Sequence, residues 1–82
     1  MDNTVRIVLV EDDETIRNGY AYLLNNQEGF KVVKTYSSAE SAIKNINDDA
    51  ADIFLLDISL TGISGIDAID EIKEKAPKAQ II

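Results

Sequence analysis

The sequence predicts an α/β protein with a parallel sheet and helices on both faces, in the order β-α-β-α-β-α-β. Short apolar runs rich in Val and Ile recur along the chain, as is typical of buried strands. Between these runs, apolar residues recur at intervals of three and four, which is typical of amphipathic helices. No repeat or linker interrupts the alternation. Strands that alternate with helices favour a parallel sheet with right-handed crossovers.

The first strand is predicted over Val5 to Val10, where a β-branched run is broken by a single arginine. The helix that follows is predicted to begin at Asp13, whose side chain can cap its N-terminus. Glu14 lies in the first turn, where a negative charge complements the helix dipole. The apolar periodicity predicts that this helix ends near Asn26.

The second strand is predicted over Phe30 to Tyr36, and its two lysines indicate an edge of the sheet close to solvent. The next four residues, Ser37 to Glu40, fit a capping box in which Ser37 caps the second helix and Glu40 reaches back. The buried stripe of that helix is expected to consist of Ala39, Ala42, Ile43 and Ile46.

A polar connection over residues 47–52 leads to a third strand, Ile53 to Leu56, which is short and entirely apolar. This strand ends directly at Asp57. Turn residues follow, and Ser64 is the expected cap of a third helix.

The apolar stripe of the third helix predicts that it stops before Pro77, because the residue before a proline disfavours helical backbone. The residues from Ala79 to Ile82 then begin like a fourth strand.

The composition limits the chemistry to carboxylates. The 82 residues are enough for one domain, and 8 Lys and Arg against 15 Asp and Glu give a net charge of −7. Such a chain lacks the basic stripe that nucleic-acid binding needs. With no His and no Cys, it has neither an imidazole base nor a zinc site of the usual type. The apolar runs are too short for a membrane span or a signal peptide, so we expect a cytoplasmic protein without a membrane partner.

Two groups of acids follow predicted strands directly. Glu11, Asp12 and Asp13 come after the first strand, and Asp57 comes after the third. In a doubly wound sheet these strands are neighbours, so the acids are expected to meet at one edge. Carboxylates so close repel each other unless a cation balances them, and Mg²⁺ is the natural choice for oxygen ligands. An aspartate beside such an ion can act as a nucleophile towards a phosphoryl group.

A purely structural role has to be weighed for each acid. Acids at the start of a helix commonly cap it, so we assign Asp13 and Glu14 to capping and dipole interactions. Glu11 and Asp12 lie at the expected ligand-binding edge, which favours a functional role. Asp57 follows an apolar strand, where stability alone does not call for a carboxylate; it can also cap a helix, but Ser64 is a better start for the third one.

The motifs VRIVLVEDD and LLDISLTGISG together resemble the receiver domain of two-component response regulators, with similar order and spacing from Val5 to Ile82. The resemblance implies a flavodoxin-like fold with strand order 2-1-3-4-5. It further implies that Asp57 accepts a phosphoryl group from a histidine kinase or a small phosphodonor. Asp12 would bind Mg²⁺ directly, Glu11 through water, and Ser59 through its backbone carbonyl.

The resemblance stops inside the fourth strand. It therefore implies that residues 1–82 are the N-terminal part of a single receiver domain, with no effector domain. The family's Ser or Thr after strand four, its Lys after strand five and its last two helices have no counterpart in these residues. One sheet face and the edge at 79–82 would then lie open, so we expect association of two copies, as a homodimer or by domain swapping.

The function that the resemblance implies is a phosphorylation-controlled switch, not an enzyme, that governs an output domain, most commonly a transcriptional one. An alternative is a receiver-like interaction module that is never phosphorylated. A third class is an aspartate-dependent phosphohydrolase similar to the haloacid dehalogenases. That class is disfavoured, because such enzymes carry a second Asp two places after the nucleophile and here that place is Ser59.

Overall fold

A computed structural model describes residues 3–56 and 65–82 of the chain. The elements are β1 (Val5–Val10), α1 (Glu14–Asn25), β2 (Phe30–Tyr36), α2 (Ala39–Lys44), α3 (Ile46–Asp49), β3 (Ile53–Leu56), α4 (Gly65–Lys75) and β4 (Gln80–Ile81). All strand pairs are parallel, and the order across the sheet is β2-β1-β3-β4. This confirms the predicted parallel α/β fold. It also places β2 and its two lysines at an edge, as the sequence predicted.

The register places the carboxyl ends of three strands side by side. Val10, the last residue of β1, lies opposite Tyr36 at the end of β2 and opposite Leu56 at the end of β3. In parallel pairing, the residues that follow these strand ends start from the same edge of the sheet.

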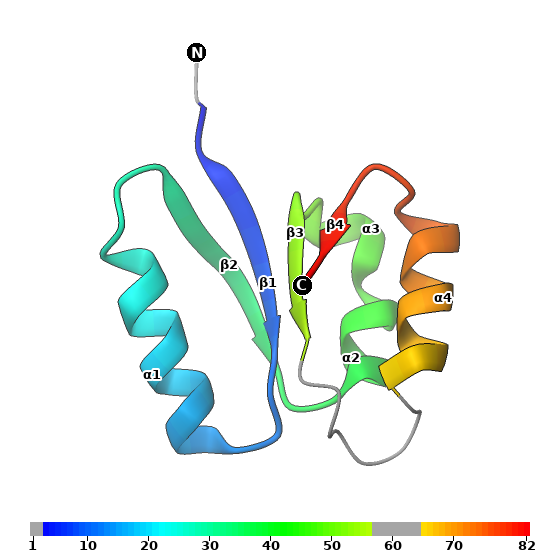
Figure 1. Ribbon diagram of the computed structural model, residues 1–82, viewed down its shortest axis with the longest axis horizontal. Helices are drawn as coiled ribbons and strands as arrows, with labels where there is room; N and C mark the ends of the chain where they lie inside the picture. Colours follow the sequence, from blue (N-terminus) through cyan, green and yellow to red (C-terminus); the bar gives the residue numbers. More distant parts are fainter. Residues whose placement is uncertain (1–2, 57–64) are drawn as a thin grey trace.

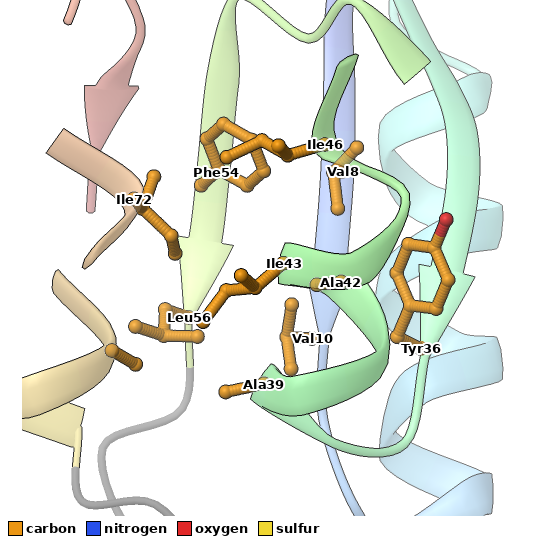
Figure 2. Close-up of a cluster of buried hydrophobic side chains, with 11 residues drawn as sticks. Val8, Val10, Tyr36, Ala39, Ala42, Ile43, Ile46, Phe54, Leu56 and Ile72 are labelled. Atoms are coloured by element: carbon orange, nitrogen blue, oxygen red, sulfur yellow. The ribbon is translucent and has the colours of Figure 1, made fainter. Parts of the chain in front are cut away.

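The helices divide between the two faces of the sheet, with α1 on one face and α2, α3 and α4 on the other (Figure 1). The side with three helices holds the main core, most of which is drawn in Figure 2. Its buried members are Val8, Val10, Tyr36, Ala39, Ala42, Ile43, Ile46, Phe54, Leu56, Ala68 and Ile72. All four residues of the stripe predicted for the second helix are thus buried, but Ile46 belongs to α3 and not to α2. Alternate residues of each strand point to this face because side chains in a strand have a period of two.

The face that carries α1 is less well covered. No residue of α1 is buried, and Ile16, Tyr20 and Leu23 are 44%, 49% and 59% exposed. A groove of about 340 Å³ lies between this helix and the sheet. Its lining includes Leu9 and Leu55 of the sheet together with Ile16 and Tyr20. The expectation of an open face is therefore only partly met: Leu9 of β1 is buried, whereas Leu55 of β3 is half-buried and the apolar side chains of α1 are exposed.

The cap of the second helix differs from the prediction by one residue. Ser38, not Ser37, is the N-cap of α2, and its hydroxyl accepts a hydrogen bond from the backbone N–H of Ser41 at 3.2 Å. Ser38 has the extended backbone that a cap requires, with φ −144°. The helix therefore begins at Ala39, which is fully buried and turns the apolar stripe towards the sheet.

The predicted polar connection over 47–52 is also partly wrong, because its first part belongs to α3. The side chain of Ile46 is buried and holds this short helix against the core. The Arg6 guanidinium donates to the carbonyls of Asp49 and Ala50 at the end of α3, at 2.9 and 3.2 Å. These bonds satisfy carbonyls that a helix end leaves without partners.

The remaining boundaries agree closely with the sequence. The first helix is capped by Asp13 and followed by Asn26 as its C-cap, as predicted. The helix α4 ends at Lys75, before the proline, and β4 is shorter than the strand expected over 79–82. The predicted cap Ser64 lies outside the described residues.

Candidate functional site

The candidate site starts with Glu11, directly after β1. Its backbone N–H donates to the carbonyl of Tyr36 at 3.0 Å, so the pairing of β1 with β2 continues one residue beyond the strand. Its carbonyl accepts a hydrogen bond from Nη1 of Arg17 in α1 at 2.9 Å. The side chain is 6% exposed, which makes it the one buried charged residue among those described. Burying a carboxylate is costly unless a cation, a proton or hydrogen bonds balance it.

Asp13, two residues further on, begins α1. Its Oδ1 accepts a hydrogen bond from the backbone N–H of Ile16 at 3.0 Å, which confirms the capping role predicted for it. Asp12 lies between this cap and Glu11, and it is exposed. The structure therefore gives three consecutive acids different surroundings. Glu11 is buried, Asp12 is exposed to solvent, and the carboxylate of Asp13 accepts the capping hydrogen bond of α1.

The end of β3 lies beside this loop, because Leu56 is the register partner of Val10. Asp57 follows Leu56 in the sequence, but Asp57 and Ser59 lie outside the described residues. Of the four predicted metal ligands, the structure thus describes Glu11 and Asp12. The part of the chain from 3 to 56 and from 65 to 82 contains no group of three or more His, Cys, Asp or Glu side chains that could hold a metal ion.

The chemistry of the described donors suits a hard divalent cation. Glu11 and Asp12 provide adjacent carboxylates, one buried and one exposed, at the carboxyl edge of a parallel sheet. Mg²⁺ is usually held by one or two protein carboxylates and completes its coordination with water and phosphate oxygens. The donors at the end of β1 therefore fit such an ion.

Sequence reasoning did not single out Arg17 or Tyr36. Nothing in the helical pattern indicates that Arg17 reaches back across the turn to the end of β1. The hydroxyl of Tyr36 donates a hydrogen bond to the Asp49 carboxylate. Burial, and then this hydrogen bond and the negative charge of Asp49, raise the pKa of Tyr36 to about 12. The phenol is therefore neutral at physiological pH.

The described helices are all too short or too polar to cross a lipid bilayer.

Comparison with known proteins identifies the family. Residues 7–82 match the model of the response regulator receiver domain. The chain is 35% identical over 78 residues to the response regulator UvrY of Escherichia coli K12, a match that covers 95% of this chain and 36% of that protein. It thus spans about a third of the length of that relative.

Solved structures agree with this match. The two-component response regulator of the LuxR family from Aurantimonas sp. SI85-9A1 superposes with a TM-score of 0.88 at 33% identity, over 95% of this chain and 56% of that one. A complex of the response regulator RcsB with DNA gives a TM-score of 0.90 at 25% identity, over 98% of this chain and 41% of that one. With a β2-β1-β3-β4 parallel sheet and acids following β1, the chain belongs to the response regulator receiver domain family.

Proposed function

We propose that this chain is the phosphoacceptor domain of a two-component response regulator, in which Asp57 receives a phosphoryl group from a histidine kinase or a small phosphodonor. The observation that carries the proposal is the register of β1 and β3, in which Val10 lies opposite Leu56. Leu56, which directly precedes Asp57 in the sequence, therefore ends at the same edge of the sheet as the residue before Glu11, and this supports the proposal.

The proposed metal site uses Asp12 as a direct ligand of Mg²⁺ and Glu11 as a ligand through water. Asp57 and the backbone carbonyl of Ser59 complete the protein ligands. When bound, the ion neutralises charge on the phosphoryl oxygens that approach the acceptor. Asp12 is exposed, so its carboxylate is accessible to an ion from solvent, and Glu11 places a second, buried carboxylate directly before it.

In the reaction, an oxygen of the Asp57 carboxylate attacks phosphorus while the bond from phosphorus to the donor breaks. The product carries more negative charge and more acceptor oxygens than the aspartate. We propose that this change switches an output domain, so the chain acts as a switch and not as a classical enzyme. The resemblance to a LuxR-family regulator and to a regulator in complex with DNA supports a transcriptional output. A transcriptional output in turn supports a cytoplasmic location.

The test is incubation of the full-length protein with acetyl phosphate and Mg²⁺, followed by intact-mass measurement. The wild type is expected to gain one phosphoryl group, and Asp57→Asn is expected to gain none. Asp13→Asn is the matched control, because the Asp13 side chain caps α1 and asparagine also caps helices well. A gain that persists in Asp57→Asn contradicts the acceptor role, as does a wild type that gains nothing.

The alternative, an interaction module that is never phosphorylated, draws support from the exposed apolar side chains of α1. A titration with Mg²⁺ followed by NMR discriminates the two functions. A phosphoacceptor shows a saturable response that Asp12→Asn abolishes, whereas a module without a metal site shows none.

We also propose that two copies of the 82-residue chain associate through the groove beside α1, as a homodimer or by domain swapping. Each copy presents the same apolar side chains there, so the surfaces can meet around a twofold axis. The molar mass in solution tests this proposal. A value that stays at 9.0 kDa at all concentrations would rule it out.

A further inference from the structure

The backbone on both sides of Asp12 is fixed by hydrogen bonds. Before it, Glu11 is held twice: its N–H donates to Tyr36 and its carbonyl accepts from Arg17. After it, Asp13 is held by the cap of α1 and by the backbone N–H of Arg17, which donates to the Asp13 carbonyl at 2.8 Å. Asp12 is thus an exposed residue whose two neighbours are both held in place by hydrogen bonds.

Arg17 contributes a hydrogen bond on each side of Asp12. Its guanidinium holds the carbonyl before Asp12, and its backbone N–H holds the carbonyl after it. The side chain is partly buried and crosses six positions in the sequence to reach the end of β1. No residue of α1 is buried, and this hydrogen bond from Arg17 joins the first turns of the helix directly to the end of β1.

We infer that Arg17 is a positioning residue for the acidic loop, which sets the backbone of Glu11 and Asp12 for Mg²⁺. The inference rests on the proposed function and extends it to a residue outside the predicted ligand set. A hydrogen bond from a charged donor is stronger than one between neutral groups, so the guanidinium is an effective anchor for a carbonyl. Partners that orient metal ligands are as much a part of a metal site as the ligands themselves.

A positioning role and a purely electrostatic role of Arg17 predict opposite changes in Mg²⁺ affinity when its side chain is removed. A positive guanidinium beside a cation site repels the cation, so its removal would tighten Mg²⁺ binding if charge were its main contribution. A positioning role instead requires that removal weakens binding, because the loop loses its preset conformation and binding has to order it. The sign of the change in affinity therefore decides between the two.

The experiment measures Mg²⁺ affinity by calorimetry in the full-length protein, for the wild type and for Arg17→Met, Arg17→Lys, Lys31→Met and Asp12→Asn. We expect Arg17→Met to weaken binding by about tenfold, the lower limit for the loss of an orienting partner. Arg17→Lys keeps a charged donor and is expected to recover most of the affinity. Lys31→Met removes the same charge at the amino end of β2 and is expected to bind like the wild type.

The outcomes separate the inference from the proposed site. If Asp12→Asn abolishes binding but Arg17→Met binds equally or more tightly, the site stands and the role of Arg17 is refuted. If the wild type shows no saturable binding, the proposed site fails, and the role of Arg17 fails with it. Thermal unfolding without Mg²⁺ checks that each variant is folded, and Arg17→Gln replaces Arg17→Met if that variant does not fold.

Discussion

Individual residues show how the tertiary structure changes side-chain chemistry. Tyr36 ends β2, and its side chain is 9% exposed within the main core. Its hydroxyl reaches Asp49 at the end of α3, a residue 13 positions away in the sequence. Burial disfavours the phenolate, and the neighbouring carboxylate disfavours it further, so the pKa of Tyr36 rises to about 12.

This shift predicts how stability depends on pH. The pKa of a tyrosine in an unfolded chain is about 10. Between pH 10 and pH 12 the unfolded state loses this proton while the folded state retains it, so the unfolded state binds fewer protons. The contribution of Tyr36 to the free energy of unfolding is therefore fully present below pH 10 and is lost as the pH rises towards 12.

Urea unfolding at pH 9, 10, 11 and 12 measures this effect. We expect the stability advantage of the wild type over Tyr36→Phe to shrink across this interval. The control is Tyr22→Phe, which makes the same substitution at a tyrosine that is 71% exposed. An advantage over Tyr36→Phe that stays constant between pH 9 and pH 12 contradicts the assignment.

At the scale of the elements, the start of α2 shows the limit of local patterns. Both Ser37 and Ser38 are good caps by residue type, and a glutamate three residues after Ser37 favoured the first. The structure selects Ser38 because the helix must present Ala39, Ala42 and Ile43 to the sheet. Packing of the buried stripe therefore decides the register of the cap.

The two serines provide a matched pair of variants. Ser38→Ala removes the hydrogen bond to the Ser41 N–H and is expected to lower the free energy of unfolding by about 1 kcal/mol. Ser37→Ala removes an exposed hydroxyl outside the helix and is expected to change it by less than about 0.5 kcal/mol. Chemical denaturation measures the free energy of unfolding of both variants. A larger decrease for Ser37→Ala than for Ser38→Ala would support the capping box predicted from the sequence.

The helix α3 also depends on contacts that local sequence patterns do not show. The residues from Asn47 to Asp52 are mostly polar and lack a helical apolar stripe, so the sequence predicted a loop. Packing of Ile46 in the core and the hydrogen bonds from Arg6 of β1 stabilise a single short helix there. Both interactions join segments that are distant in the sequence, and no local pattern can reveal them.

For the whole molecule, the two faces of the sheet differ in how much apolar surface they bury. Three helices pack on one face, whereas α1 alone among the described helices lies on the other (Figure 1). The side chain of Ile72 in α4 is fully buried, whereas Ile16 in α1 is 44% exposed. The free energy of burial scales with apolar area removed from water, so the face with α2, α3 and α4 contributes more to stability.

Equivalent truncations on the two faces test this asymmetry. Ile72→Ala leaves a cavity in the main core and is expected to destabilise the protein by about 2–5 kcal/mol. Ile16→Ala shortens a side chain already exposed to solvent and is expected to cost less than about 1 kcal/mol. Urea denaturation of both variants provides the comparison. Equal losses would show that α1 is packed as firmly as α4.

Local patterns in the sequence were enough to predict the alternation of strands and helices, the cap at Asp13, the edge position of β2 and the acids after β1. These features depend on residue type and short-range periodicity, which are local. Four features could be found only in the folded chain: Ser38 caps α2, α3 forms, Arg17 donates to the carbonyl of Glu11, and the pKa of Tyr36 is raised. Each of these depends on contacts between segments that only the folded sheet brings together.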